Sequence, residues 1–230
     1  MVHRTGDTVE ETWDRIADSF TTTRTKPWQQ CTTFIDHLSP TSTVADLGCG
    51  NGRHTIPSAQ HCKAVIALDL SHKLLCHAQQ RSQQTSLTNI LYLHADVVHL
   101  PLKDHSLDAI LFIASLHNIK GREKRTFALK EIYRVLTPEG RALISVWSRW
   151  QDRYRRYFLR QLWNSKQEFG DIEIPWKHHQ LNVSRFYHLY SKREFVRELR
   201  DAGFIIDSLE NVRFHSRYTP DNYFAVVRKS

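Results

Sequence analysis

Short, continuously apolar runs alternate along the chain with segments whose apolar residues recur every three or four positions. Five such runs predict strands at residues 44–47, 64–68, 90–93, 106–113 and 142–147. The periodic segments between them predict helices over residues 53–61, 71–78 and 129–136. Strands that alternate with helices form parallel sheets with helices on both faces, so the pattern predicts an α/β fold.

The two ends of the chain extend this core. Apolar residues one helical turn apart predict one helix over residues 13–20 and another over residues 31–38. The polar loop between them, residues 21–28, can lie over a bound ligand. Near the other end, Ser191-Lys192-Arg193-Glu194 is a capping box that begins a helix. Apolar runs at residues 204–209 and 223–227 then bring the predicted sheet to seven strands.

The first predicted strand leads into Asp46-Leu47-Gly48-Cys49-Gly50-Asn51-Gly52. Glycines tolerate positive φ and let a ligand lie directly on the backbone. The first turn of a doubly wound sheet is also where such folds hold nucleotide-like ligands. An acid precedes the glycines, and the third glycine comes one residue earlier than in the dinucleotide fingerprint, so a nicotinamide dehydrogenase is disfavoured. The run resembles motif I of the class I S-adenosylmethionine (SAM) methyltransferases.

Acids also follow the next two predicted strands. Asp69, at the end of the second strand, is well placed to accept hydrogen bonds from both ribose hydroxyls of a nucleoside. Asp96 resembles the acid that accepts from the adenine amine in this family. The resemblance implies SAM as the cofactor, bound by Asp46, Gly48, Gly50, Gly52, Asp69, Leu70, Asp96, Val97 and Ile113.

The composition narrows the class of partner. The formal net charge is +8, which suggests a polyanion such as nucleic acid, although a basic but inert surface has the same charge. The four cysteines form no C-x-x-C pair, so we expect no metal site. No apolar run approaches the roughly 20 residues of a membrane span, and no secretory signal is evident, so we expect a cytoplasmic protein.

An insert before the last helix, residues 148–190, concentrates cations and aromatic rings. Its Lys and Arg residues outnumber its acids, and three tryptophans lie among them. The cations are Arg149, Arg153, Arg155, Arg156, Arg160, Lys166, Lys177 and Arg185, and the tryptophans are Trp150, Trp163 and Trp176. This mixture suits single-stranded or loop nucleic acid. The alternative is a helical lid with a packed aromatic face, because Tyr154, Tyr157, Phe158 and Leu162 fit one side of a helix.

Several segments are similar to one family in particular, the tRNA wobble-uridine carboxymethyl methyltransferases. They are Trp13-Asp14-Arg15-Ile16-Ala17, Thr23-Arg24-Thr25-Lys26-Pro27-Trp28, the glycine motif, Ile113-Ala114-Ser115-Leu116-His117, Arg125 to Ala128, Val146-Trp147, Pro175-Trp176 and Arg185-Phe186-Tyr187-His188-Leu189-Tyr190. The resemblance covers nearly the whole chain and implies one class I methyltransferase domain over residues 1–230. The family usually has two histidines where this chain has His117-Asn118, which leaves the role of position 118 open.

This resemblance implies that 5-carboxymethyluridine at the anticodon wobble position of tRNA is converted to its methyl ester. A carboxylate is ionised at neutral pH, so the reaction needs no general base. It does need a cation to orient the substrate, and Arg24 and Arg185 are our candidates because a guanidinium grips a carboxylate bidentately. We expect His117 and Tyr187 beside them at the catalytic site. The expected substrate-binding residues are Trp28, Trp147, Arg149, Arg153 and His188.

The resemblance also implies two partners, the tRNA anticodon stem-loop and a small zinc-binding activator protein. The activator adds a strand to the methyltransferase sheet, which needs an exposed edge. Ile90-Leu91-Tyr92-Leu93 is the expected edge strand, so we expect a heterodimer there. Two other functions stay open. A small-molecule methyltransferase would have an apolar lid without cationic excess, and a non-catalytic SAM- or tRNA-binding subunit would bind tRNA without turnover.

Overall fold

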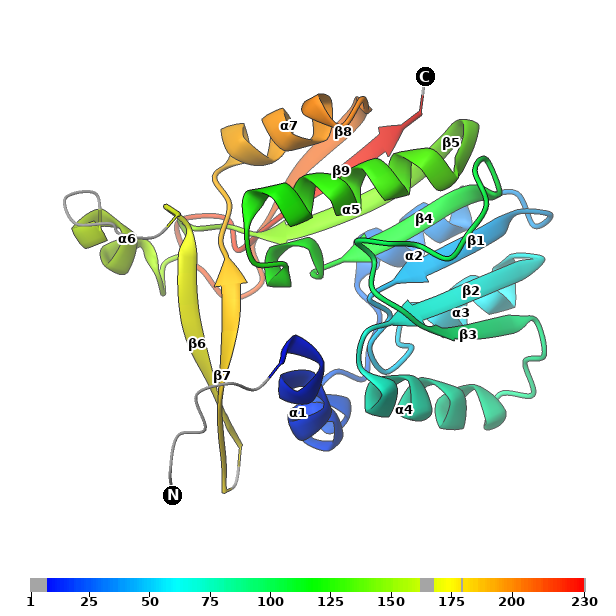
Figure 1. Cartoon of the computed structure of the whole chain (residues 1–230), viewed down its shortest axis with the longest axis horizontal. Helices are drawn as coiled ribbons and strands as arrows, with labels where there is room; N and C mark the ends of the chain where they lie inside the picture. The colour runs from blue at the N-terminus through cyan, green and yellow to red at the C-terminus, as the bar shows by residue number, and fades with distance from the viewer. Residues whose placement is uncertain (1–7, 162–167, 179, 230) are drawn as a thin grey trace.

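The computed structural model describes residues 8–161, 168–178 and 180–229 and is built on a seven-stranded sheet (Figure 1). The strand order is β3-β2-β1-β4-β5-β9-β8. The first five strands in this order, β3 to β5, pair in parallel, while β9 runs antiparallel to both β5 and β8. The strands are β1 (Thr43–Leu47), β2 (Ala64–Asp69), β3 (Ile90–His94), β4 (Leu107–Ile113), β5 (Leu136–Trp147), β8 (Ile205–Val212) and β9 (Asn222–Arg228).

Helices cover both faces of this sheet. They are α1 (Val9–Thr23), α2 (Gln29–Asp36), α3 (Thr55–His61), α4 (His72–Gln83), the short 3-10 helix η1 (Leu116–Asn118), α5 (Arg122–Val135), α6 (Arg155–Gln161) and α7 (Lys192–Asp201). Figure 1 shows α5 and α7 in front of the sheet and α2 and α3 behind it. Within the described residues, no helix is long and apolar enough to span a bilayer.

Strand β4 shows why the central strands are apolar on both of their faces. Ile110 and Phe112 pack into the core under α5 and α7, while Ala109 and Leu111 pack against α2 on the other face. Successive side chains of a strand point to opposite faces, so a strand covered on both sides reads as one continuous apolar run. The α/β class, the seven strands and the edge position of β3 are therefore confirmed.

The predicted helical insert is wrong in part. Among the described residues of the insert, α6 is helical, and the antiparallel pair β6 (Asp171–His178) and β7 (Leu181–His188) follows it. Tyr154 and Phe158 are buried, as a packed helix face requires, but Tyr157 is 40% exposed. The remaining members of the pattern, Leu162, Trp163 and Lys166, lie outside the described residues.

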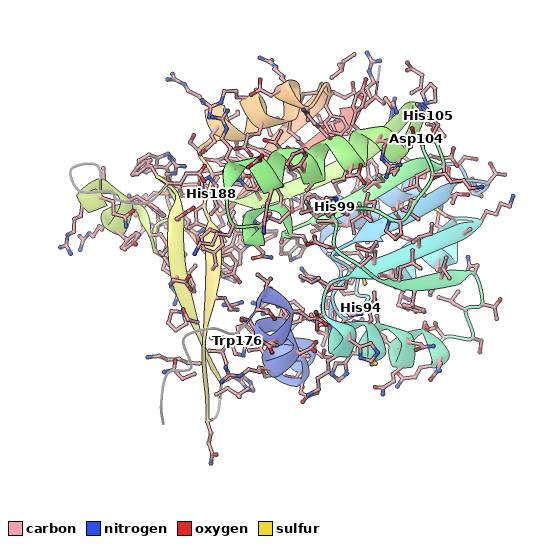
Figure 2. All side chains as sticks on the ribbon, in the orientation of Figure 1. His94, His99, Asp104, His105, Trp176 and His188 are labelled. Carbon is pink, nitrogen blue, oxygen red and sulfur yellow. The ribbon has the colours of Figure 1, made fainter. Side chains whose placement is uncertain are left out.

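The β6–β7 hairpin packs against α1 and η1, and it reaches the main sheet where Tyr187 stacks on Trp147 at the end of β5 (Figure 1). Trp176 of β6 donates a hydrogen bond from Nε1 to Ser19 Oγ of α1 at 2.8 Å. Figure 2 labels Trp176 beside α1 and His188 where β7 approaches the sheet. The hairpin and α1 therefore enclose the space above the carboxyl ends of the central strands.

Candidate active site

A pocket of about 240 Å³ lies at the carboxyl ends of the parallel strands, where open α/β sheets bind ligands. Motif I, the ends of β4 and β5, η1, α1 and β7 form its walls. Of the expected site residues, the lining includes Arg24, Trp28, Gly48, Asp69, Leu70, Asp96, Ile113, His117, Trp147, Arg185 and Tyr187. Segments from the two ends of the chain thus meet above motif I.

The motif I turn depends on its glycines. Gly48, Gly50 and Gly52 have φ values of 65°, 55° and 76°, a region that other residues rarely adopt. A Cβ on Gly48 would lie 2.3 Å from Ser115 Oγ, so the turn also packs closely against the end of β4. Any other residue at position 48 would strain the backbone and crowd Ser115.

Two buried acids organise the base of the pocket. Asp46 lies beneath the lining and accepts a hydrogen bond from Thr55 Oγ1 at 2.6 Å. Burial raises its pKa to about 7. Asp69 accepts the backbone N–H of Gly50 at 2.7 Å and that of Ser71 at 2.8 Å, one on each oxygen. Burial raises the pKa of Asp69 to about 6, and each oxygen keeps a second lone pair for a ligand hydroxyl.

Arg185 is a buried cation that pairs with no carboxylate among the described residues. Its side chain lines the pocket with the residue only 7% exposed, and its Nε has no hydrogen-bond partner. The guanidinium lies among three rings, with Cζ 4.7 Å from the centroid of Trp176, 5.1 Å from Tyr187 and 5.7 Å from Trp13. Burial and the nearby Arg24 lower its pKa. Among the described residues, no acid neutralises it.

Arg24 reaches the same pocket from the end of α1. Its Cζ lies 5.9 Å from the Phe20 ring and 5.8 Å from the Trp176 ring. Its Nη1 donates to the carbonyl of Thr23 at 3.3 Å, and within the described part of the chain it has no ion pair. Two guanidiniums face one cavity, which favours an anionic ligand between them.

His117 is buried and neutral. Its Nδ1 accepts the backbone N–H of Trp147 at 3.1 Å, so Nε2 carries the proton. That Nε2–H has no partner among the described atoms. Burial, together with the positive charges of His188 and Arg185, lowers the pKa of His117 to about 3. The ring packs against both Trp147 and Tyr187, at 5.3 Å and 5.4 Å between centroids, and these two rings stack on each other at 4.9 Å.

The departure at position 118 has a structural explanation. Asn118 Nδ2 donates to the carbonyl of Ala114 at 3.1 Å. Ala114 has φ of 54°, a strained conformation for a residue other than glycine, and its N–H donates to Ser145 Oγ at 3.0 Å. Asn118 therefore holds the turn that follows β4, and it also lines the pocket.

Comparison with known proteins shows which family the chain resembles. The methyltransferase domain model matches residues 45–144. A putative methyltransferase from Encephalitozoon cuniculi is 30% identical over 197 residues, which is 85% of this chain and 86% of that protein. The tRNA (carboxymethyluridine(34)-5-O)-methyltransferase ALKBH8 of Macaca fascicularis is 33% identical over 165 residues. That match covers 72% of this chain but only 23% of the relative.

The chain belongs to the class I SAM-dependent methyltransferases. Its sequence similarity within them is to the tRNA carboxymethyluridine methyltransferases, which include one from Arabidopsis thaliana at 33% identity over 63% of this chain and 33% of that protein. A SAM-dependent methyltransferase from Methanosarcina mazei has the same fold, with a TM-score of 0.75 at 19% identity over 89% of this chain and 98% of that one. SAM is the cofactor of this methyltransferase.

Some expected site residues of this methyltransferase lie away from the pocket lining. Gly50, Gly52 and Val97 do not line the pocket. Gly50 does donate its N–H to Asp69, which is a lining residue. Arg153 is exposed, with Cζ 5.4 Å from the Tyr154 ring. These placements leave their roles as proposals.

Arg149 and His188 belong instead to a buried ionic network at the base of the hairpin. Arg149 pairs with Glu194 and donates to the carbonyls of Leu189 and Phe169. The two nitrogens of His188 contact Asp171 at 2.8 Å and Glu194 at 3.2 Å. These two carboxylates raise the pKa of His188 against the effect of burial. Glu168, His188 and Glu194 have metal-ligand chemistry, but Arg125 and Arg149 already pair with the two glutamates.

The pocket also contains residues that sequence reasoning missed. Asn51 lies within motif I, and its Nδ2 donates to the carbonyl of Arg24 at 2.8 Å. Arg53 stacks over Trp28, with Cζ 4.4 Å from the ring. Lys120, just before α5, and Lys124, in its first turn, also line the pocket. The position of Asn51 within the glycine motif and of Arg53 directly after it was the available signal, whereas nothing local marks the two lysines.

Proposed function

We propose that this methyltransferase acts on tRNA and esterifies the carboxymethyl group of 5-carboxymethyluridine at the anticodon wobble position. The activities for which its tRNA methyltransferase relatives are named support this substrate, although the chain spans only about a quarter of the animal proteins' length. The net charge of +8 suits a tRNA partner.

The observation that carries the proposal is the unneutralised cation at position 185. A buried guanidinium without an acid is costly, so it implies an anion that enters the pocket. A carboxylate matches the bidentate geometry of Arg185 and can also accept the free Nε2–H of His117. Arg24 adds a second positive charge at the same cavity.

The residues at the other side of the pocket fit SAM. The side-chain amide oxygen Oδ1 of Asn51 is buried without a partner among the described atoms, and it can accept from the ammonium group of the cofactor. We assign the ribose hydroxyls to Asp69 and the adenine amine to Asp96, which is exposed at the pocket rim. When bound, SAM supplies an electrophilic methyl group on a sulfonium.

The chain itself contributes position and exclusion of water. The substrate carboxylate is already ionised at neutral pH, and His117, with its pKa near 3, stays neutral and can only donate. The stacked pair Trp147 and Tyr187 offers a flat apolar surface for the uracil ring. Holding nucleophile and electrophile together in a water-poor pocket is a proximity effect and needs no general base.

The experiment is a methyl-transfer assay with labelled SAM and two RNAs. One is an anticodon stem-loop with 5-carboxymethyluridine at the wobble position, and its matched control has unmodified uridine there. Mass spectrometry of the nucleosides should find a methyl ester only in the first RNA. Transfer to small carboxylic acids but to neither RNA would support the small-molecule enzyme. RNA binding without any transfer would support a non-catalytic subunit.

We further propose that the exposed edge of β3 binds a small methyltransferase activator by strand addition. Leu91 on this edge is 55% exposed, and an uncovered apolar edge strand is an aggregation hazard unless a partner pairs with it. A chain of the complex between the Haloferax volcanii Trm112 methyltransferase activator and a putative methyltransferase shares this fold. Its TM-score is 0.69 at 17% identity, over 96% of this chain and 97% of that one.

A further inference from the structure

The loop between β8 and β9 presents cations and an aromatic ring to solvent. Arg213, Arg217 and Tyr218 are exposed, and Tyr218 at 65% is far more exposed than a packed aromatic residue. The guanidiniums of Arg155 and Arg217 lie near the Tyr218 ring, with Cζ 5.9 Å and 5.3 Å from its centroid. Residues 213–219 contain no acid.

Two aspartates hold the backbone of this loop in place. Asp221 Oδ2 accepts the backbone N–H groups of Phe214, His215 and Ser216 at 2.6, 2.7 and 2.9 Å. Asp152 Oδ2 accepts those of Arg217 and Tyr218 at 2.8 and 3.2 Å. The Oδ2 atoms of both aspartates are used by the main chain, so the loop is fixed, and Asp152 Oδ1 also pairs with Arg155 at 3.9 Å. Arg213 and Arg217 have no ion pair among the described residues, so they keep their charge for a partner.

The loop adjoins the pocket. Phe214 stacks on Trp28 with ring centroids 5.1 Å apart and an interplanar angle of 28°. Trp28 in turn lines the pocket beside Arg53. The backbone N–H of Asp152, shortly after the end of β5, donates to Ser216 Oγ at 3.0 Å. A polymer whose target group occupies the pocket would therefore pass this loop.

We propose that residues 213–219, together with Arg155, bind the RNA strand beside the nucleotide that enters the pocket. Tyr218 stacks on an unpaired base, and Arg213 and Arg217 contact phosphates. Aromatic faces and guanidiniums in this combination recognise single-stranded or loop RNA. This proposal rests on the proposed tRNA substrate. An acidic protein would also pair with the arginines, but it would offer Tyr218 no base to stack on.

The test measures binding of a fluorescent anticodon stem-loop RNA with 5-carboxymethyluridine to the full chain in the presence of SAM. Tyr218→Ala should weaken binding about tenfold, whereas Tyr218→Phe keeps the ring and should bind as the wild type does. The double variant Arg213→Gln, Arg217→Gln should lower the slope of log Kd against log salt by roughly 1.4, the value for two phosphate contacts on a single strand. Arg200→Gln is the matched control, because Arg200 is exposed on α7 and precedes β8, at the end away from the loop.

Each outcome separates this proposal from the proposed function. Calorimetry of SAM binding should give wild-type affinity for every variant, which shows that the fold is intact. If the wild type binds and methylates the RNA but Tyr218→Ala binds equally well, the loop proposal is wrong and the tRNA function stands. If each charge removed weakens binding equally in Arg200→Gln and in the double variant, the effect comes from the net charge of the protein. The loop proposal is then wrong. If the wild-type protein does not bind the RNA at all, both proposals fail.

Discussion

The arginine at position 185 makes opposite contributions to stability and to activity. Its guanidinium loses hydration without gaining an acid, and three aromatic rings replace only part of that loss. We therefore expect Arg185→Met to raise the free energy of unfolding by roughly 1 kcal/mol. The same variant should lower kcat/KM for the carboxylate substrate by roughly tenfold to a hundredfold. Denaturant titration and the methyl-transfer assay measure the two effects.

Arg200→Met serves as the control for Arg185→Met, since Arg200 is exposed and its replacement should change neither quantity much. Binding of SAM alone should be unaffected in both variants. Loss of both stability and activity in Arg185→Met would mean that the arginine is a structural residue. The proposed carboxylate contact would then be wrong.

Individual residues of the pocket were predictable to different degrees. The acids and glycines of motif I stand out because their spacing is set by one local turn. The partners of Arg149 and His188 could not be read from the sequence, because Glu194 and Asp171 come from α7 and β6. A cation in a basic stretch looks the same whether it faces RNA or a buried glutamate. Only the tertiary packing distinguishes the two cases.

At the scale of elements, the turn after β1 depends on Gly48 in two ways. Alanine there would have to adopt φ of 65°, and its Cβ would lie 2.3 Å from Ser115 Oγ and 2.7 Å from Ser115 Cβ. We expect Gly48→Ala to lower the free energy of unfolding by about 3 kcal/mol, from strain and overpacking together. Gly50→Ala shares the positive φ but meets only Phe20 at 3.4 Å, so it should cost about 1 kcal/mol. Equal losses in denaturant titration would refute the close contact with Ser115.

The two edges of the sheet allow a controlled test of the activator proposal. Leu91 on β3 and Ile205 on β8 are both exposed apolar residues on edge strands, at 55% and 39%. We expect Leu91→Lys to abolish co-purification with a co-expressed activator, because a charge there opposes strand addition. Ile205→Lys, the same change on the opposite edge, should leave the complex intact. The reverse pattern would place the activator on β8.

The elements that sequence reasoning predicted best are those with continuous apolar runs, because β1, β4 and β5 are covered on both faces. The hairpin β6–β7 was not predicted because it is covered only in part and has no continuous apolar run. It packs on α1 and on a small cluster that includes Ile172, Ile174 and Tyr187, so its burial pattern is broken by exposed charges. The contacts that stabilise the hairpin are made with α1, which is far away along the chain.

At the scale of the whole molecule, two buried acids and two buried histidines near the pocket titrate with opposite effects on stability. Burial raises the pKa of Asp46 to about 7 and that of Asp69 to about 6, so their contribution to stability falls as pH rises from about 4 through those values. Burial lowers the pKa of His117 to about 3 and that of His54 well below 6.5. Their contribution is present above pH 6.5 and is lost as pH falls below it.

These opposed contributions predict that the ligand-free protein has nearly constant stability between pH 5 and pH 7, since one pKa unit corresponds to about 1.4 kcal/mol in each direction. Replacing one of these four titrating groups should reveal the pH dependence caused by the other three. Asp46→Asn cannot titrate, so its free energy of unfolding should rise by about 2 kcal/mol over that interval, driven by the histidines. His54→Gln should fall by a similar amount, driven by the acids. Denaturant titrations at pH 5, 6 and 7 measure all three proteins. Parallel curves for the two variants would mean that these groups do not titrate as their burial implies.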